Sequence, residues 1–300
     1  MADTAPPAWW PDRNKSCFDT VGALRWHAQH WPCRSGSGCA PQALLLHGTG
    51  SGSFSWRHLA PLLAERFEVH APDLPGHGWT QTPAHQSLSL PSVAAALDAW
   101  MKTRGIAPSL VVGHSAGAAI ALRLVLDGMV SPALTVSING AILPMQGPIG
   151  RLFLPIAKLL STNPLVAPAF AAWASGPGAA RRLLASTGST LDAEGERCYA
   201  HLVADRTHAA GALRLMASWD LRPLEAELSR LSTPLLLIAA LSDRTLPPSH
   251  ALRVRDRLPL ARLEQLPGLG HLAHEENAGA VGSAVLRAWV ETRSASPVND

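Results

Sequence analysis

Short apolar runs alternate with helically spaced stretches along most of the chain. Continuous hydrophobic runs of this length are typical of strands that are covered on both faces of a sheet. The runs lie at residues 41–47, 67–71, 110–112, 134–141, 235–241 and 263–266. Helical spacing at 56–64 and 92–104 separates some of them. Strands that alternate with helices in this way predict an α/β fold with a mostly parallel, doubly wound sheet.

The N-terminal region has a different pattern. Residues up to Trp10 are expected to form a loose arm. Residues 18–29 then divide at Gly22 into two extended stretches, which predicts an antiparallel hairpin at the edge of the sheet.

Residues 144–217 break the alternation, because they contain no clear strand run and are rich in Ala, Leu, Pro and Gly. Helix-like blocks occupy 149–160 and 196–206. The segment lies between two predicted sheet strands, so it must leave the sheet and return. We therefore predict a helical cap at 144–217, inserted between a first core part at 1–143 and a second at 218–300. The alternative is a long helical connection with no part in binding.

The most specific motif is Gly113-His114-Ser115-Ala116-Gly117. It follows the apolar run at 110–112 and leads into a helix-like stretch, which is the order of a nucleophile elbow. The two glycines allow strand and helix to approach closely around a strained serine. A bare G-x-S-x-G is often an ordinary turn, so the assignment of Ser115 as a nucleophile depends on the flanking strand and helix.

Acyl transfer by a serine also needs a base and a group that orients it. Asp243 follows the 235–241 run, where a carboxylate can hold an imidazole, although a turn-forming aspartate is the alternative. His271 lies in a glycine-bracketed loop after the last strand and is the predicted base. His274 is its nearest rival but falls in the following helix, and His114 adjoins Ser115 and points away from its hydroxyl. His47 and His77 fit better as side chains that support turns.

Backbone N–H groups are the expected donors of the oxyanion hole, since they need no reorganisation as charge develops. We assign the N–H of Ala116, at a helix N-terminus, and that of Thr49, in the loop after the 41–47 run. This Gly-rich loop lacks the residue order of a nucleotide-binding site. No two histidines stand at i, i+4 with a carboxylate on one helix face, so we predict no metal and no cofactor.

Composition narrows the class of protein. The 300 residues are 47% hydrophobic and 16% charged, with a net charge of +3 and no basic run, which argues against nucleic-acid binding. The first residues do not resemble a signal peptide, and the four cysteines have no zinc spacing. Cys33 and Cys39 could pair in an oxidising compartment, but we expect free thiols in a cytoplasmic protein.

Taken together, these motifs resemble the α/β-hydrolase superfamily from about Leu24 onward. The motifs are 47–50 (HGTG), 73–78 (DLPGHG), 113–117 (GHSAG), Asp243, and Gly270 with His271. The chain order Ser115, Asp243, His271 is the one expected of that superfamily. A closer resemblance is to the magnesium-chelatase accessory proteins of bacteriochlorophyll-producing bacteria. It rests on 10–13 (WPDR), 22–27 (GALRWH), 55–57 (SWR) and 62–67 (LLAERF).

The resemblance implies a serine hydrolase of the esterase type in bacteriochlorophyll biosynthesis, but it names no substrate. Similar-looking epoxide hydrolases and haloalkane dehalogenases use a carboxylate nucleophile, so Ser115 argues against both. Carbon–carbon bond hydrolases and cofactor-free oxygenases keep the same three residues and stay open. The alternative function is an accessory protein that binds or delivers a hydrophobic tetrapyrrole without turnover.

The apolar cap is the only clue to the substrate. Its apolar residues lie at 152–156, 159–160 and 165–166, with Phe170 and Trp173. Such a stripe is more often simple packing, but it can also line a wide apolar pocket or rest on a membrane surface. In that case Lys158, Arg181 and Arg182 would meet anionic groups. We expect a hydrophobic substrate, such as a tetrapyrrole or lipid ester, in contact with Trp173 and residues 152–160.

Overall fold

The computed structural model describes residues 5–35, 40–145, 155 and 157–295. Within them a central sheet of eight strands has the order β1-β2-β4-β3-β5-β6-β7-β8. The strands are β1 (Ser16–Val21), β2 (Leu24–Trp31), β3 (Gln42–Leu46), β4 (Glu68–Pro72), β5 (Pro108–His114), β6 (Leu134–Ile138), β7 (Leu235–Ala240) and β8 (Ala261–Leu266). Each predicted strand run is present, with ends that differ by a few residues.

The strand directions decide where functional loops can meet. β1 and β2 form the predicted edge hairpin, which turns at Gly22 with a φ of 60°, and β2 runs antiparallel to β4. All other neighbouring pairs are parallel. The prediction of a mostly parallel sheet is therefore confirmed. The loops that follow β3, β4, β5, β7 and β8 consequently leave the sheet at one common edge.

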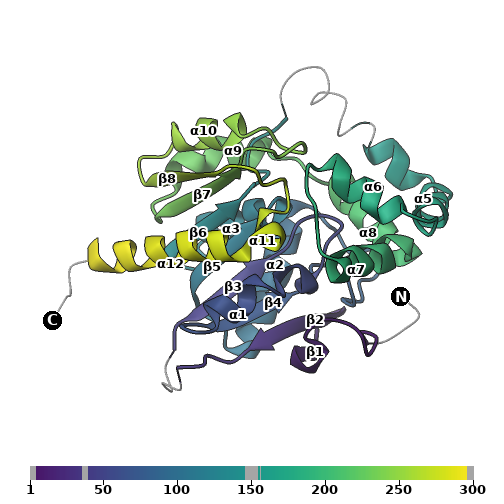
Figure 1. Ribbon diagram of the computed structural model, residues 1–300, viewed down its shortest axis with the longest axis horizontal. Coiled ribbons are helices and arrows are strands. Elements are labelled where there is room, and N and C mark those ends of the chain that lie inside the picture. Colours follow the sequence, from purple (N-terminus) through teal and green to yellow (C-terminus); the bar gives the residue numbers. More distant parts are fainter. Residues whose placement is uncertain (1–4, 36–39, 146–154, 156, 296–300) are drawn as a thin grey trace.

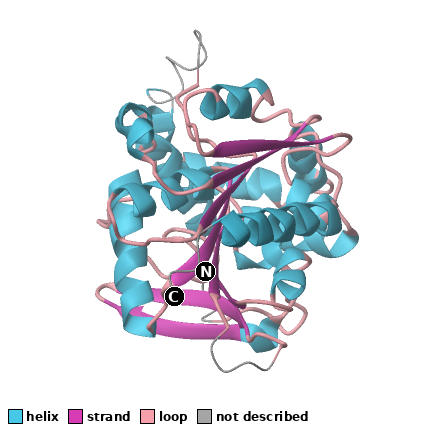
Figure 2. Ribbon diagram, turned by 90° about the vertical axis from the view of Figure 1, so that its left-hand side faces the viewer, coloured by secondary structure: helices cyan, strands magenta, loops and turns pink. Residues whose placement is uncertain are grey.

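Helices cover both faces of the twisted sheet (Figure 2). They are α1 (Leu59–Leu63), α2 (Leu90–Arg104), α3 (Ala116–Leu126), α5 (Val166–Ala174), α6 (Ala179–Ser186), α7 (Ala193–Ala204), α8 (Arg206–Ala217), α9 (Arg222–Glu227), α10 (Ser249–Arg255), α11 (Ala273–Glu276) and α12 (Ala278–Ala295). Short 3-10 turns are η1 (Arg13–Lys15), η2 (Ser53–Trp56) and η3 (Leu228–Arg230). The predicted helix at 56–64 is thus divided between η2 and α1.

Alternate side chains of each buried strand belong to two separate cores. In β3, Leu44 and Leu46 pack with α2, α3 and α10, whereas Ala43 and Leu45 pack with α1 and α12. Both cores are apolar, which explains why the central strands have no alternating polar residues. Packing on both faces holds the sheet in place, and with it the edge from which the functional loops leave.

Helices α5 to α8 lie together beside the sheet and come from the segment predicted as a cap (Figure 1). Part of the predicted 149–160 helix and of the apolar 152–156 run lies outside the described residues. The predicted helix at 196–206 is wrong in its extent, because α7 ends at Ala204 and Asp205 caps α8 through the N–H of His208. No described helix is both long and apolar enough to cross a membrane.

The prediction of a loose N-terminal arm up to Trp10 is also wrong for the part that is described. The Trp10 ring is buried and packs edge-on against Phe54 and Trp79, with ring centroids 5.1 Å and 4.2 Å away. Together with side chains of α6 and α7 these rings form a third apolar cluster between cap and core. The described part of the arm is therefore fixed to the rest of the protein by the packing of Trp10 in this cluster.

Candidate active site

Ser115 stands at the predicted nucleophile elbow between β5 and α3. Its φ of 51° and ψ of −117° lie in a strained region for a residue with a side chain. The N–H of Ser115 donates to the carbonyl of Ile138, and its own carbonyl accepts from Ala141, which holds this conformation. A Cβ on Gly117 would lie 2.0 Å from the carbonyl oxygen of Leu46, so this close approach requires glycine.

Asp243 and His271 form the predicted acid–base pair. His271 lies beyond β8, and its Nδ1 is 2.7 Å from Asp243 Oδ2 beyond β7. The other carboxylate oxygen of Asp243 accepts from the N–H groups of Thr245 and Leu246 at 2.7 Å and 2.9 Å. The carboxylate is thereby fixed, and an Nδ1–H bonded to it leaves Nε2 of His271 as the proton acceptor.

The backbone of His271 is held from three directions. Its carbonyl accepts from Nε2 of His114 at 2.9 Å and from the side-chain amide of Asn139 at 2.8 Å. Its N–H donates to the carbonyl of Thr187, at the end of cap helix α6, which also accepts from the N–H of Arg244. His114 therefore supports the backbone of His271, the predicted base. The cap segment at Thr187 ties the Asp243 loop to the His271 loop.

The two predicted oxyanion donors face the same cavity as Ser115 and His271, since all four residues line it. Ala116 begins α3, where the N–H groups of the first turn have no acceptor in the helix. Within the described residues, no hydrogen-bond acceptor is found for the N–H of Thr49 or Ala116. Gly48 lies against Ser115, because a Cβ there would be 3.0 Å from the serine Cβ. Two backbone N–H groups without an acceptor thus belong to residues that line the same cavity as Ser115.

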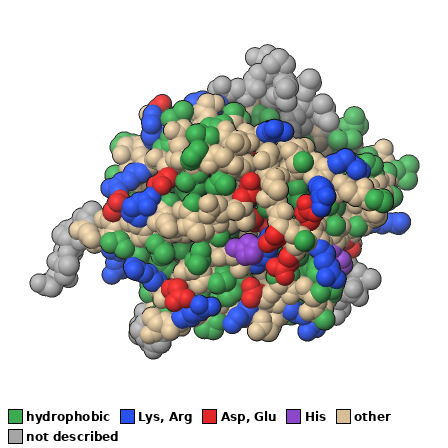
Figure 3. Space-filling model, in the orientation of Figure 1, with side chains coloured by type: hydrophobic (Ala, Val, Ile, Leu, Met, Phe, Trp, Pro, Cys, Tyr) green, Lys and Arg blue, Asp and Glu red, His purple; other side chains and the backbone are tan. Residues whose placement is uncertain are grey.

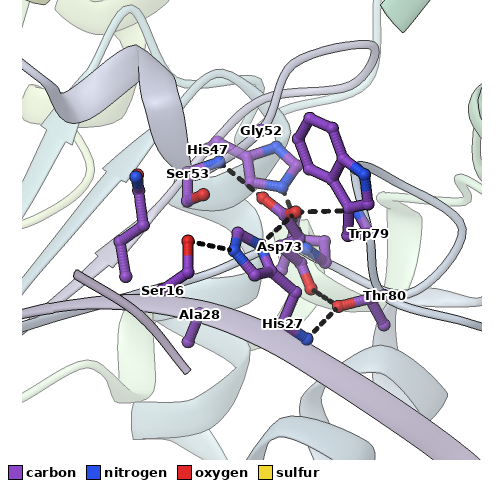
Figure 4. Close-up of polar contacts among 12 residues, drawn as sticks. Ser16, His27, Ala28, His47, Gly52, Ser53, Asp73, Trp79 and Thr80 are labelled. Carbon is purple, nitrogen blue, oxygen red and sulfur yellow. Dashed lines mark hydrogen bonds and ion pairs between the residues drawn. The ribbon is translucent and has the colours of Figure 1, made fainter. Parts of the chain in front are cut away.

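A buried aspartate, Asp73, connects the loop after β3 with the loop after β4 (Figure 4). Oδ1 of Asp73 accepts from the N–H of Ser53 at 2.6 Å, and Oδ2 accepts from the N–H of Trp79 and contacts Nδ1 of His27. The neighbouring His27 and these N–H groups hold the pKa of Asp73 well below its usual range despite burial. Asp73, the first residue of the 73–78 motif, thus connects the loops after β3 and β4.

Ser16, His27 and Asp73 also form a second Ser–His–Asp series. Ser16 Oγ lies 3.0 Å from Nε2 of His27, whose Nδ1 lies 2.7 Å from Asp73. The His27 and Asp73 side chains are almost completely buried, and none of the three residues lines the large cavity. The series therefore resembles a triad only in its hydrogen bonds, since no substrate carbonyl can reach it through that cavity.

The cavity above Ser115 has a volume of about 1120 Å³, slightly above the usual range for ligand sites. Its walls come mainly from the cap and are largely apolar. The apolar lining includes Leu143, Phe170, Leu183, Leu184, Val203, Leu213, Met216, Leu221 and Leu246. Lys158, Asp220 and Arg222 add charge to the lining. The cavity can hold a large apolar group beside a polar reaction centre.

Trp173, which we predicted to contact the substrate, does not line this cavity. Its side chain is 48% exposed, with the Arg182 guanidinium 5.9 Å from its ring centroid. Phe170, one turn earlier on α5, lines the cavity instead. Sequence spacing identified the helix as apolar but could not tell which of its faces is turned inward.

Several histidines around the site are held neutral. Burial lowers the pKa of His114 and of His274 well below the usual value, and the other nearby histidines lower both further. The ring of His274 lies between Trp56 and His114, with centroids 4.6 Å and 4.4 Å away, and it makes no contact that would make it the base. His47 supports a turn as predicted, because its Nε2 accepts from Leu74 and its Nδ1 donates to the carbonyl of Gly48.

One group of metal-type side chains comes together in the described part of the chain, on β2 and β4. Nε2 of His30 is 2.9 Å and Nε2 of His70 is 4.0 Å from one oxygen of Glu68. The two imidazole rings stack with 5° between their planes and 4.8 Å between centroids. Their in-plane lone pairs therefore run parallel and do not converge on one ion, and the group lies apart from the cavity.

Tyr199 is a cavity residue that the sequence pattern did not reveal. It is the only tyrosine in the chain and lies on α7, with its hydroxyl 2.9 Å from Ser51 Oγ and 2.8 Å from Glu275 Oε1. Burial raises the pKa of Glu275 to about 7, although Arg57 opposes the rise. In the sequence, this residue could be noticed only as a single tyrosine within a predicted cap helix. No local sequence pattern indicates which residues its hydroxyl contacts.

Known proteins share this architecture. The family model described as "Alpha/beta hydrolase family" matches residues 43–284. The magnesium-chelatase 30 kDa subunit of Rhodobacter capsulatus is 36% identical over 291 residues, which are 97% of this chain and 100% of that protein. The pimeloyl-[acyl-carrier protein] methyl ester esterase of Aromatoleum aromaticum is 30% identical over 271 residues, covering 82% of this chain and 98% of that protein. A crystal structure of an α/β-hydrolase fold protein from Burkholderia ambifaria matches with a TM-score of 0.75 at 23% identity, covering 90% of this chain and 97% of that one.

Proposed function

The chain belongs to the α/β-hydrolase family, and we propose that it is a serine hydrolase acting on an ester bond of a hydrophobic substrate. One observation supports this most strongly. The strained Ser115 and His271, which is hydrogen-bonded to Asp243, come from different loops and line one cavity. A binding protein has no evident need for this convergence.

In the proposed reaction Ser115 Oγ attacks the ester carbonyl carbon while Nε2 of His271 takes the hydroxyl proton. The carbonyl oxygen becomes an anion that accepts from the N–H groups of Thr49 and Ala116. Collapse breaks the bond to the alcohol, which leaves with the proton from His271. A water molecule then attacks the acyl-serine by the same steps and releases the acid and free Ser115.

The cavity supports a large apolar substrate. Each 100 Å² of apolar surface removed from water contributes about 2.5 kcal/mol to binding before ordering costs are subtracted. Lys158 lines the wall near Asp220, whose pKa is lowered mainly by its bonds to Arg222 and also by Lys158. Among the described residues Lys158 itself forms no ion pair, so it can receive an anionic group. A tetrapyrrole ester or a lipid ester has both features. The relation to a magnesium-chelatase subunit supports the tetrapyrrole and a setting in bacteriochlorophyll biosynthesis.

A chain-length series tests this proposal. We expect kcat/KM for p-nitrophenyl esters to rise from acetate to long acyl chains, and porphyrin methyl esters to be hydrolysed. Ser115→Ala should abolish turnover and keep the melting temperature. Preference for short polar esters would refute the large apolar substrate, and unchanged turnover by Ser115→Ala would refute the serine mechanism.

The size of the cavity also favours a second function, a carrier that holds a tetrapyrrole for magnesium chelatase without turnover. Complementation of a deletion strain separates the two. A folded Ser115→Ala protein that fully restores pigment synthesis would establish the carrier and exclude the enzyme. If it restores none, the carrier fails.

We also propose that the protein works in the cytoplasm with its cap resting on a membrane surface. Large apolar side chains are exposed on the cap, including Leu159 at 71%, Leu165 at 73% and Trp173 at 48%. Hydrophobic and basic side chains lie close together at that outer edge in Figure 3. The test is flotation with anionic vesicles. We expect the wild type to float with the vesicles and Leu159→Ser/Leu165→Ser to remain behind, and equal flotation of both would refute the contact.

A further inference from the structure

The cap contributes one side chain that bridges two loops of the active site. Tyr199 of α7 is buried and lines the cavity. Its O–H donates to Glu275, so its oxygen accepts the O–H of Ser51. Ser51 ends the loop that carries Thr49, and Glu275 lies four residues after His271. One phenol oxygen therefore connects the oxyanion loop with the segment that follows the base.

The oxyanion loop needs such an anchor because glycines make it pliable. Gly48, Gly50 and Gly52 alternate with Thr49 and Ser51, and Gly50 has a φ of 78°. The N–H of Ser51 donates back to the carbonyl of Gly48 at 3.2 Å, which closes a tight turn around Thr49. The direction of the Thr49 N–H is thus set by how firmly Ser51 is held.

The other end of the bridge is itself fixed. The second carboxylate oxygen of Glu275 accepts from Arg57, which also pairs with Asp192 at the start of α7. A Cβ on Gly195 would be 2.5 Å from the Arg57 guanidinium, so a side chain there would displace the arginine from this position. The Tyr199 ring packs edge-on against Phe54 with 5.0 Å between centroids. The phenol is therefore rigid enough to position Ser51.

We propose that Tyr199 is a positioning residue for the oxyanion hole, acting through Ser51 to aim the N–H of Thr49. The proposal rests on the serine hydrolase mechanism above. If Tyr199 has this role, helix α7 of the cap contributes to the geometry of the oxyanion hole. Removal of one oxyanion donor typically costs about 100- to 1000-fold in kcat, so loosening one donor without removing it should cost about 10-fold.

The experiment compares Tyr199→Phe, Ser51→Ala and their double variant. Phe keeps the ring against Phe54 and removes only the hydroxyl. We expect each single variant to lower kcat about 10-fold with KM within about 2-fold, and the double variant to lose no more than a single one, because both break the same bridge. A trifluoromethyl ketone binds as an oxyanion, so its affinity should fall by the same factor in each variant. The affinity for a non-hydrolysable ether with the same acyl chain length should not change.

His58→Ala is the matched control. It breaks another contact between the core and α7, the 2.8 Å bond to Asp192, without touching the oxyanion loop. It should leave kcat and ketone affinity unchanged. Equal loss of ketone and ether binding in Tyr199→Phe, or full additivity in the double variant, would overturn the positioning role. A wild-type protein that binds neither ketone nor ester would instead overturn the proposed function, so the two failures are distinguishable.

Discussion

The protein should lose stability steeply as the pH falls from 7 to 6, because many of its histidines are buried and neutral. Burial lowers the pKa of seven of them, several of which surround the active site. They are His47, His70, His77, His114, His208, His250 and His274. The pKa falls to about 4 for His47, His70, His208 and His250 and to about 3 for His77, and it falls well below the usual value for His114 and His274. A histidine in the unfolded chain titrates at about 6.5.

The sign follows from which state binds protons. Below pH 6.5 the unfolded chain takes up protons that the folded protein refuses, so acid favours unfolding. Stability is complete above pH 6.5 and is lost as the pH falls toward the folded pKa values. As the pH falls from 7 to 6, each such histidine lowers the free energy of unfolding by about 0.7 kcal/mol, and the seven together lower it by about 5 kcal/mol. Glu275 opposes this by about 1 kcal/mol, since its raised pKa of about 7 makes the folded state bind its proton first.

The expected net loss is therefore about 4 kcal/mol, a large part of the roughly 5–15 kcal/mol that stabilises a typical domain. Urea unfolding at pH 7 and pH 6, followed by tryptophan fluorescence, measures it directly. His274→Leu should reduce the difference by about 0.7 kcal/mol, whereas replacing the exposed His85 with Gln should not change it. If the free energy of unfolding of the wild type differed by less than about 1 kcal/mol between pH 7 and pH 6, the buried histidines around this site could not all be neutral.

Three further changes probe separate parts of the structure. Asp243→Asn should lower kcat by about 10³- to 10⁴-fold with little change in melting temperature, because it loses the acceptor that orients His271; a loss under tenfold would argue against this role. Gly117→Ala should prevent stable folding, since its Cβ would lie 2.0 Å from a backbone oxygen; a soluble variant with wild-type melting would contradict the close approach. Phe170→Ala should raise KM for long-chain esters, whereas Trp173→Ala should leave KM for soluble esters unchanged, as steady-state kinetics on both variants will show.

The core and the order of the reactive loops could be predicted because their signals are local. A continuous apolar run, a glycine-flanked serine and a helix specify the elbow at Ser115 without information from the rest of the chain. The carboxyl ends of parallel strands meet at one edge, so Asp243 and His271 could be placed from the strand pattern. The geometry of these loops then followed from the topology.

The contacts between cap and core could not be predicted in this way. Trp173 and Phe170 belong to the same apolar helix, and which one points inward depends on how α5 is docked. Tyr199 meets Ser51 across 148 residues of sequence, and no periodicity specifies such a pair. The tight approach of Gly195 to Arg57 is likewise a tertiary property.

Fluorophosphonate labelling followed by peptide mapping tests the central claim most directly, because the probe reacts with a serine only where a base and an oxyanion hole activate it. We predict one phosphonylated residue, Ser115, and no labelling of folded Ser115→Ala. The chain supplies its own control, since Ser16 is hydrogen-bonded to the His27–Asp73 pair but does not line the cavity. Absence of label in the folded wild type, or label on Ser16 in place of Ser115, would contradict the account.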